Sequence, residues 1–139
     1  MRFEASAEVG APAHEVFETY ADVVNWPEWT ASVTSVERLD DGPLRVGSRA
    51  RVRQPRLPVA VWEVTELLPG QSFTWVARGP GVRTTGTHRV EPLPDGRSRV
   101  TAILDQSGPL GPVVGLFTRS LTQTYLQTEV NGIKTHCEK

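Results

Sequence analysis

The sequence predicts an α+β fold in which a curved antiparallel sheet of about seven strands wraps around one long C-terminal helix. Three observations carry this prediction: polar–apolar alternation at the N-terminus, short β-like runs from residue 32 to 106, and helical periodicity over 112–137. One side of such a sheet must be covered, and the terminal helix is the only element long enough to cover it. The 139 residues suit one domain, which we expect to span 1–139.

The N-terminal segment predicts a strand followed by two short helices. Residues 2–9 alternate with a period of two, which indicates a half-buried strand. Pro12 suits a helix start, and residues 13–21 carry apolar side chains at helical spacing. Residues 22–29 follow as a second short helix or turn, which Pro27 interrupts.

The middle of the chain reads as a series of strands joined by short turns. The expected strands lie near 32–39, 46–54, 59–68, 72–78, 83–92 and 97–106. Proline, glycine and aspartate clusters separate them, as in Pro94-Asp95-Gly96. Because the connections are short, we expect neighbouring strands to be antiparallel.

The C-terminal helix carries two apolar stripes. Val113, Val114, Phe117, Leu121 and Tyr125 share one side, whereas Leu126, Val130, Ile133 and Cys137 share another, displaced by more than a quarter turn. One interpretation is that the first half covers a pocket while the second half packs on the sheet. The alternative is a bend near Gly115 with ordinary packing throughout.

Composition excludes several classes of protein. The net charge is -1, so there is no electrostatic footprint for nucleic acid. Cys137 is the only cysteine, which rules out an internal disulfide and suits a reducing compartment. No apolar run approaches the roughly 20 residues of a membrane helix, and the N-terminus lacks a signal-peptide pattern. We therefore expect a cytoplasmic protein without membrane insertion, as a monomer or homodimer.

Centring each hairpin on its turn predicts which side chains face inward. Trp62, Phe73, Trp75, Gly86, His88 and Leu104 fall on the inner face, and Trp75 lies beside Gly86. This mixture of large aromatic, small and isolated polar residues is found in fully packed cores. It is also typical of ligand cavities, which have apolar walls and a few orienting polar groups.

Several segments together resemble the START-like, birch-allergen-like (SRPBCC) superfamily, specifically its polyketide cyclase/dehydrase and lipid-transport branch. They are VGAPAHEVFETYADVVNWPEWT at 9–30, GSRARVRQP at 47–55, WEVTELLPGQSFTW at 62–75 and the long closing helix. The resemblance spans nearly the whole chain. It implies a helix-grip fold with a hydrophobic cavity between the sheet and the C-terminal helix. Members include ring-closing enzymes, hydrolase-like proteins and carriers.

The expected ligand-binding residues combine the inner face of the sheet with the helix. They are Trp29, Val52, Trp62, Phe73, Trp75, Gly86, His88, Leu104, Phe117, Leu121 and Tyr125. Trp26 and Trp29 could gate the cavity mouth, or they could plug the junction between the small helices and the sheet. The three histidines have no metal-ligand spacing and phosphate-binding loops are absent, so we expect no metal and no cofactor.

His88 is the candidate acid or base, since it is expected to point inward and imidazole titrates near neutrality. The alternative is a core histidine that is satisfied by a hydrogen bond, or one that orients a ligand.

Three functions follow. The chain binds a small hydrophobic molecule that is polyketide-, lipid- or aromatic-like; or it is a polyketide cyclase or dehydratase that uses His88, with Tyr125 or Gln106 as possible partners; or it is a protein–protein interaction module with a vestigial cavity.

Overall fold

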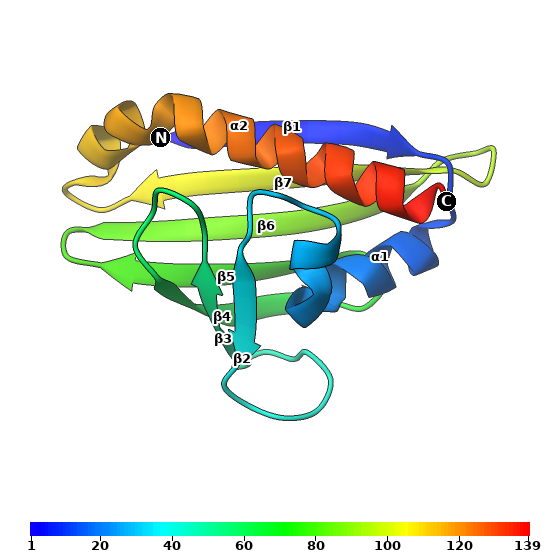
Figure 1. Ribbon diagram of the computed structural model, residues 1–139, viewed down its shortest axis with the longest axis horizontal. Coiled ribbons are helices and arrows are strands. Elements are labelled where there is room, and N and C mark those ends of the chain that lie inside the picture. Colours follow the sequence, from blue (N-terminus) through cyan, green and yellow to red (C-terminus); the bar gives the residue numbers. More distant parts are fainter.

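The computed structural model describes residues 1–139, which form one seven-stranded antiparallel sheet, two short helices and a long C-terminal helix (Figure 1). In chain order the elements are β1 (Arg2–Val9), α1 (Ala13–Ala21), the 3-10 helix η1 (Val23–Glu28), β2 (Ser35–Arg38), β3 (Arg49–Arg53), β4 (Ala60–Leu68), β5 (Ser72–Gly79), β6 (Val82–Pro92), β7 (Ser98–Ser107) and α2 (Gly111–Cys137). The predicted fold class is confirmed. None of these helices is long and apolar enough to cross a membrane.

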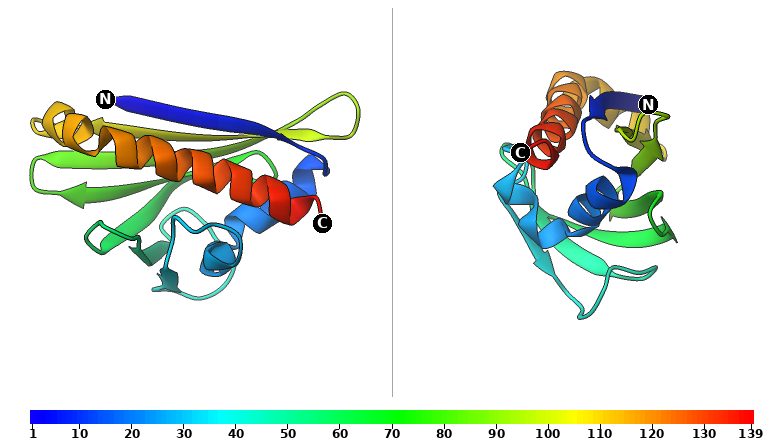
Figure 2. Two further views of the ribbon diagram at one scale, coloured as in Figure 1. Left: turned by 45° about the horizontal axis from the view of Figure 1, so that its top comes forward. Right: turned by 90° about the vertical axis from the view of Figure 1, so that its right-hand side faces the viewer.

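The sheet is curved, and its strand order brings the two ends of the chain together. The order is β1-β7-β6-β5-β4-β3-β2, so β1 pairs with the last strand rather than with its neighbour in sequence. Figure 2 shows α2 running along β1 and β7, while the sheet curves round to β2 on the far side. α1 and η1 lie at the end of the molecule where α2 ends. The helix-grip arrangement therefore encloses the inner face of the sheet.

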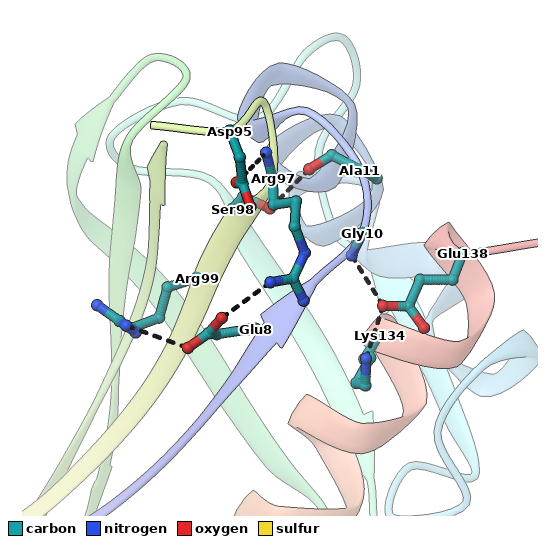
Figure 3. Close-up of polar contacts among 9 residues, drawn as sticks. All are labelled: Glu8, Gly10, Ala11, Asp95, Arg97, Ser98, Arg99, Lys134 and Glu138. Atoms are coloured by element: carbon teal, nitrogen blue, oxygen red, sulfur yellow. Dashed lines mark hydrogen bonds and ion pairs between the residues drawn. The ribbon is translucent and has the colours of Figure 1, made fainter. Parts of the chain in front are cut away.

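Polar contacts tie the end of β1 to its neighbours at this same end (Figure 3). The backbone N–H of Gly10 donates to Glu138 Oε2 at 2.8 Å, and Lys134 contacts the same oxygen at 2.6 Å. On the opposite side of β1, Arg97 Nη1 lies 3.0 Å from Glu8 Oε1. Because these groups are largely exposed, each pair adds little stability. The Gly10–Glu138 bond joins the end of α2 to the end of β1, and the Arg97–Glu8 pair joins β1 to the turn before β7.

The hairpin registers agree with those predicted. Trp75 lies opposite Gly86, and His88 pairs with Phe73 on one side and with Ala102 on the other. A Cβ atom at Gly86 would lie 3.3 Å from Cδ1 and Nε1 of Trp75, so glycine leaves room for the indole ring. Short turns centred on glycine set these registers, because a slip of one residue would turn the apolar face outward.

Helix α2 is uninterrupted, and its inward face differs from the one we expected for its first half. The residues that face inward are Gly111, Gly115, Thr118, Thr122, Leu126, Glu129, Val130 and Ile133, which are buried or half-buried. The first half therefore packs with small residues, and a Cβ atom at Gly115 would lie only 2.8 Å from Cβ of Met1. This close approach turns the apolar stripe of Val113 and Phe117 to the outside.

Candidate functional site

A small cavity of about 80 Å³ lies between the inner face of the sheet and the middle of α2. Its walls are mostly apolar. Seven of the predicted ligand-binding residues line it: Val52, Trp62, Trp75, Gly86, His88, Leu104 and Tyr125. Eight further residues complete the lining: Trp26, Val33, Gln54, Leu57, Ala102, Thr122, Leu126 and Glu129.

The other four predicted residues lie outside this cavity. Phe73 is fully buried behind His88, and the two rings stack with centroids 4.2 Å apart. Trp29 packs beneath α2 and borders a separate surface depression with Gly132. Phe117 is 85% exposed, and it borders an outer groove together with Leu121. Phe117 and Leu121 were expected at the cavity because the apolar stripe was assumed to face inward, whereas the small-residue face does so.

Of the two tryptophans that flank Pro27, only Trp26 reaches the cavity. Its indole N–H donates to the backbone carbonyl of Tyr20 at 2.8 Å, which ties η1 to the end of α1. Its ring lies 5.3 Å from those of Trp75 and His88, centroid to centroid. Trp26 therefore forms part of the wall and at the same time packs the short helices against the sheet.

His88 lies at the end of the cavity within a shell of aromatic rings. Its Nδ1 lies 3.1 Å from the carbonyl oxygen of Phe73. Because a carbonyl only accepts, Nδ1 carries the proton and Nε2 is left as an acceptor. Burial lowers the pKa of His88 to about 3, against a smaller opposing effect of the bond to Phe73. The imidazole is thus neutral near pH 7 and suits accepting a hydrogen bond better than taking a proton.

Glu129 is a cavity residue that we did not anticipate. Its side chain projects from α2, where Oε2 accepts a hydrogen bond from the hydroxyl of Tyr20 on α1. Burial raises the pKa of Glu129 to about 7, although the Tyr20 bond acts in the opposite direction. The pKa of Tyr20 is raised well above its usual value, first by its own burial and then by the adjacent Glu129 carboxyl.

A signal for Glu129 was present in the sequence. It lies three residues after Leu126 and four before Ile133, so it shares their helix face. An acidic residue in a buried apolar stripe is uncommon, and such residues gather at functional sites. Tyr20 likewise shares a helix face with the buried Val16 and Phe17.

The cavity opens between α2 and the loop that joins β3 to β4. The hydroxyl of Tyr125 donates to the backbone carbonyl of Pro55, which links helix and loop across the mouth. Leu57 from the same loop borders both the cavity and the outer groove beside Phe117. A guest that enters from the groove would pass this Tyr125–Pro55 link.

The polar chemistry of the cavity comes from few groups. No arginine or lysine lines it, and no three His, Cys, Asp or Glu side chains lie close enough together to hold a metal ion. Gln106, expected as a partner of His88, lies instead against the start of α2, where its Oε1 is buried without a hydrogen-bond partner. Its buried ionisable residues are Glu129 and His88, and Gln54, Thr122 and Tyr125 supply the other polar side chains of the lining.

The family model described as polyketide cyclase / dehydrase and lipid transport matches residues 1–138. A search of curated proteins finds no match.

Solved structures of similar fold cover almost the whole chain at low identity. A hypothetical protein of Helicobacter pylori has a TM-score of 0.83 at 16% identity, covering 99% of this chain and 88% of that one. The Zhui aromatase/cyclase from Streptomyces has a TM-score of 0.75 at 18% identity, with 99% and 93% covered. A START superfamily protein from Mycobacterium smegmatis has a TM-score of 0.74 at 16% identity, with 99% and 97% covered.

Proposed function

We propose, since this chain belongs to the polyketide cyclase / dehydrase and lipid transport family, that it binds a small hydrophobic molecule in the cavity between the sheet and α2. In this proposal residues 1–139 act as one START-like domain. The observation that carries it is an unfilled, mainly apolar cavity in which two buried polar residues, Glu129 and His88, keep free hydrogen-bonding atoms. Buried polar groups are normally paired, so free ones beside a cavity support a guest that pairs with them.

The walls suit a flat guest. The rings of Trp62 and Trp75 lie side by side with centroids 5.6 Å apart and planes 32° apart. Gly86 keeps the backbone of β6 close to these rings without a side chain of its own. Two neighbouring indoles present a broad aromatic surface and carry N–H donors, which favours an aromatic or polycyclic molecule.

Binding a guest of ordinary size requires the cavity to widen. Ligand pockets typically measure about 300–1,000 Å³, whereas this cavity holds about 80 Å³. The elements that meet at the mouth are α2 and the β3–β4 loop, in which Pro55, Arg56, Pro58 and Val59 are exposed. We infer that these two segments separate when the guest enters.

Thermal unfolding in the presence of polyketides, sterols and fatty acids tests the proposal. A ligand at about 100 times its Kd stabilises the folded state by about 2.7 kcal/mol, which raises the Tm by several degrees. The variant Ala102→Leu should lose this shift, because the added carbons would occupy the cavity that Ala102 lines. Ala31→Leu adds the same side chain at an exposed position and should keep it. The absence of a shift with every compound would contradict the proposal.

A second candidate function, a cyclase or dehydratase reaction, is favoured by the position of Glu129. A carboxyl whose pKa is about 7 suits taking a proton from a carbon beside a carbonyl group and returning it to an oxygen. With a poly-β-ketone substrate, Glu129→Gln should lower kcat by about 10²-fold or more, while His88→Asn retains most of it. If turnover is lost in His88→Asn but not in Glu129→Gln, then His88 and not Glu129 is the catalytic acid or base.

A further inference from the structure

Two hydrogen-bond acceptors without protein partners face the same cavity from opposite walls. Glu129 on α2 is 8% exposed and His88 on β6 is 5% exposed, and both line the cavity. Oε2 of Glu129 is occupied by the Tyr20 hydroxyl, but Oε1 has no partner. Nδ1 of His88 is occupied by the carbonyl of Phe73, but Nε2 has none. Above the pKa of Glu129, a guest in this cavity therefore meets two acceptors that only its own donors can satisfy.

No positive charge balances Glu129. The titratable groups that face it are Tyr20 from α1 and His88 from β6, and neither is a cation near pH 7. Charged residues on the packed elements point away to solvent: Glu18 on α1, Glu8 on β1, Arg89 on β6 and Asp105 on β7. A second carboxylate in this space would lie near Glu129 without a counter-ion, which strongly disfavours having both ionised.

We propose that Glu129 and His88 make the cavity selective for neutral ligands that carry a hydroxyl group and exclude the corresponding carboxylates. This inference rests on the ligand-binding function proposed above. A hydroxyl can donate to Oε1 of Glu129 or Nε2 of His88. The indole N–H groups of Trp62 and Trp75, whose rings line the cavity, can donate to its oxygen. An ionised fatty acid would bring its charge close to Glu129 with no cation in the lining to balance it.

Fluorescence titration tests this selectivity, because Trp26, Trp62 and Trp75 line the cavity and report on its contents. Naphthol, naphthoate and naphthalene share one ring system and differ only in the polar group. At about pH 8, naphthol should bind about tenfold more tightly than either of the others. Naphthoate should gain about tenfold in affinity between about pH 8 and about pH 6, because Glu129, with a pKa of about 7, becomes protonated over this range.

Two variants separate recognition by Glu129 from a merely structural role. Glu129→Gln should remove the pH dependence of naphthoate binding, whereas Glu66→Gln, on the exposed side of β4, should leave it unchanged. Tyr20→Phe keeps the carboxyl but removes the hydrogen bond that lowers its pKa, so the midpoint of the pH profile should move upward. This second variant keeps the test open if Glu129→Gln does not fold.

The possible results have distinct meanings. Equal affinity for naphthol and naphthoate at about pH 8, without pH dependence, would overturn the selectivity while leaving the ligand-binding function intact. Equal affinity for naphthol and naphthalene would show that the two acceptors do not recognise a donor. If none of the three compounds binds, the selectivity is overturned, while the binding function is decided separately by thermal unfolding with polyketides, sterols and fatty acids.

Discussion

Burial acts in opposite directions on the two ionisable residues of the cavity. It lowers the pKa of His88 to about 3 and raises that of Glu129 to about 7, because in each case it disfavours the charged form. Near neutral pH the imidazole is therefore uncharged, while the carboxyl is poised between its two states. The group able to exchange protons in this cavity near neutral pH is therefore Glu129. His88 stays neutral and acts only as a hydrogen-bond acceptor.

The pKa of Glu129 predicts how stability depends on pH. The folded value of about 7 lies above the ordinary 4.5, so the folded state holds its proton more tightly than the unfolded state. The raised pKa therefore adds to the free energy of unfolding in full below about pH 4.5, and this contribution is lost as the pH rises to about 7. Between about pH 4.5 and about pH 7, the free energy of unfolding of Glu129→Gln should therefore rise by about 3 kcal/mol relative to that of the wild type.

His88 makes the free energy of unfolding change with pH in the opposite direction. Its pKa is lower in the folded state, so the stability contributed by the neutral imidazole is lost as the pH falls from about 6.5 to about 3. Urea unfolding at several pH values measures both slopes. Glu66→Gln is the control, because that carboxyl is exposed on β4. A difference between Glu129→Gln and wild type that stays constant with pH would contradict the burial of an ionisable Glu129.

At the scale of elements, α2 is the part of the molecule that shapes the site. Its inward face changes along its length from glycine and threonine to larger apolar residues. The small residues let the helix lie close to Met1 and Gln106, and Tyr125 then reaches the β3–β4 loop. The cavity lies where Thr122 and Glu129 replace the large apolar side chains that would fill it.

Gly132 allows α2 to approach the segment that follows η1. A Cβ atom there would lie 2.0 Å from the carbonyl oxygen of Trp29, so either helix or loop would have to move. Gly132→Ala should therefore destabilise the protein by about 2 kcal/mol or more, despite alanine's better helix propensity. Thr124→Ala, exposed on the same helix, should change the free energy of unfolding by less than about 0.5 kcal/mol. Chemical denaturation compares the two variants; equal stability would contradict the close approach.

The bond from Tyr125 to the carbonyl of Pro55 predicts an effect on the rate of binding. Tyr125→Phe removes one hydrogen bond across the mouth, worth about 1 kcal/mol, so a guest should enter about fivefold faster. Stopped-flow tryptophan fluorescence measures this rate. An unchanged rate would mean that guests enter elsewhere.

At the scale of the whole molecule, the packing of α2 on the curved sheet buries some large apolar side chains completely and leaves others exposed to solvent. Phe73 on β5 is completely buried, whereas Phe117 on α2 is 85% exposed. Val113 and Leu116 are exposed on the same part of α2, and Leu110 is exposed just before the helix begins. This apolar surface belongs to the outer side of the helix and makes no contribution to the core.

The two phenylalanines should therefore respond differently to substitution. Phe73→Ala should cost about 3–5 kcal/mol of stability, while Phe117→Ser should change it by no more than about 0.5 kcal/mol. Urea unfolding measures both values. Light scattering on the same samples shows whether Phe117 supports self-association, as an interaction module would require. A large loss of stability in Phe117→Ser would contradict the outward orientation of the first half of α2.

The sequence by itself determined the order of elements, the antiparallel sheet and the pairing of Trp75 with Gly86. These features depend on local periodicity and on short turns, which leave little freedom of register. Only the tertiary structure decided which stripe of α2 faces the sheet, because a helix with two apolar stripes can dock through either. Because α2 approaches Met1 closely at Gly115, its small-residue face packs on the sheet. This orientation leaves Phe117 exposed and places Glu129 beside Tyr20.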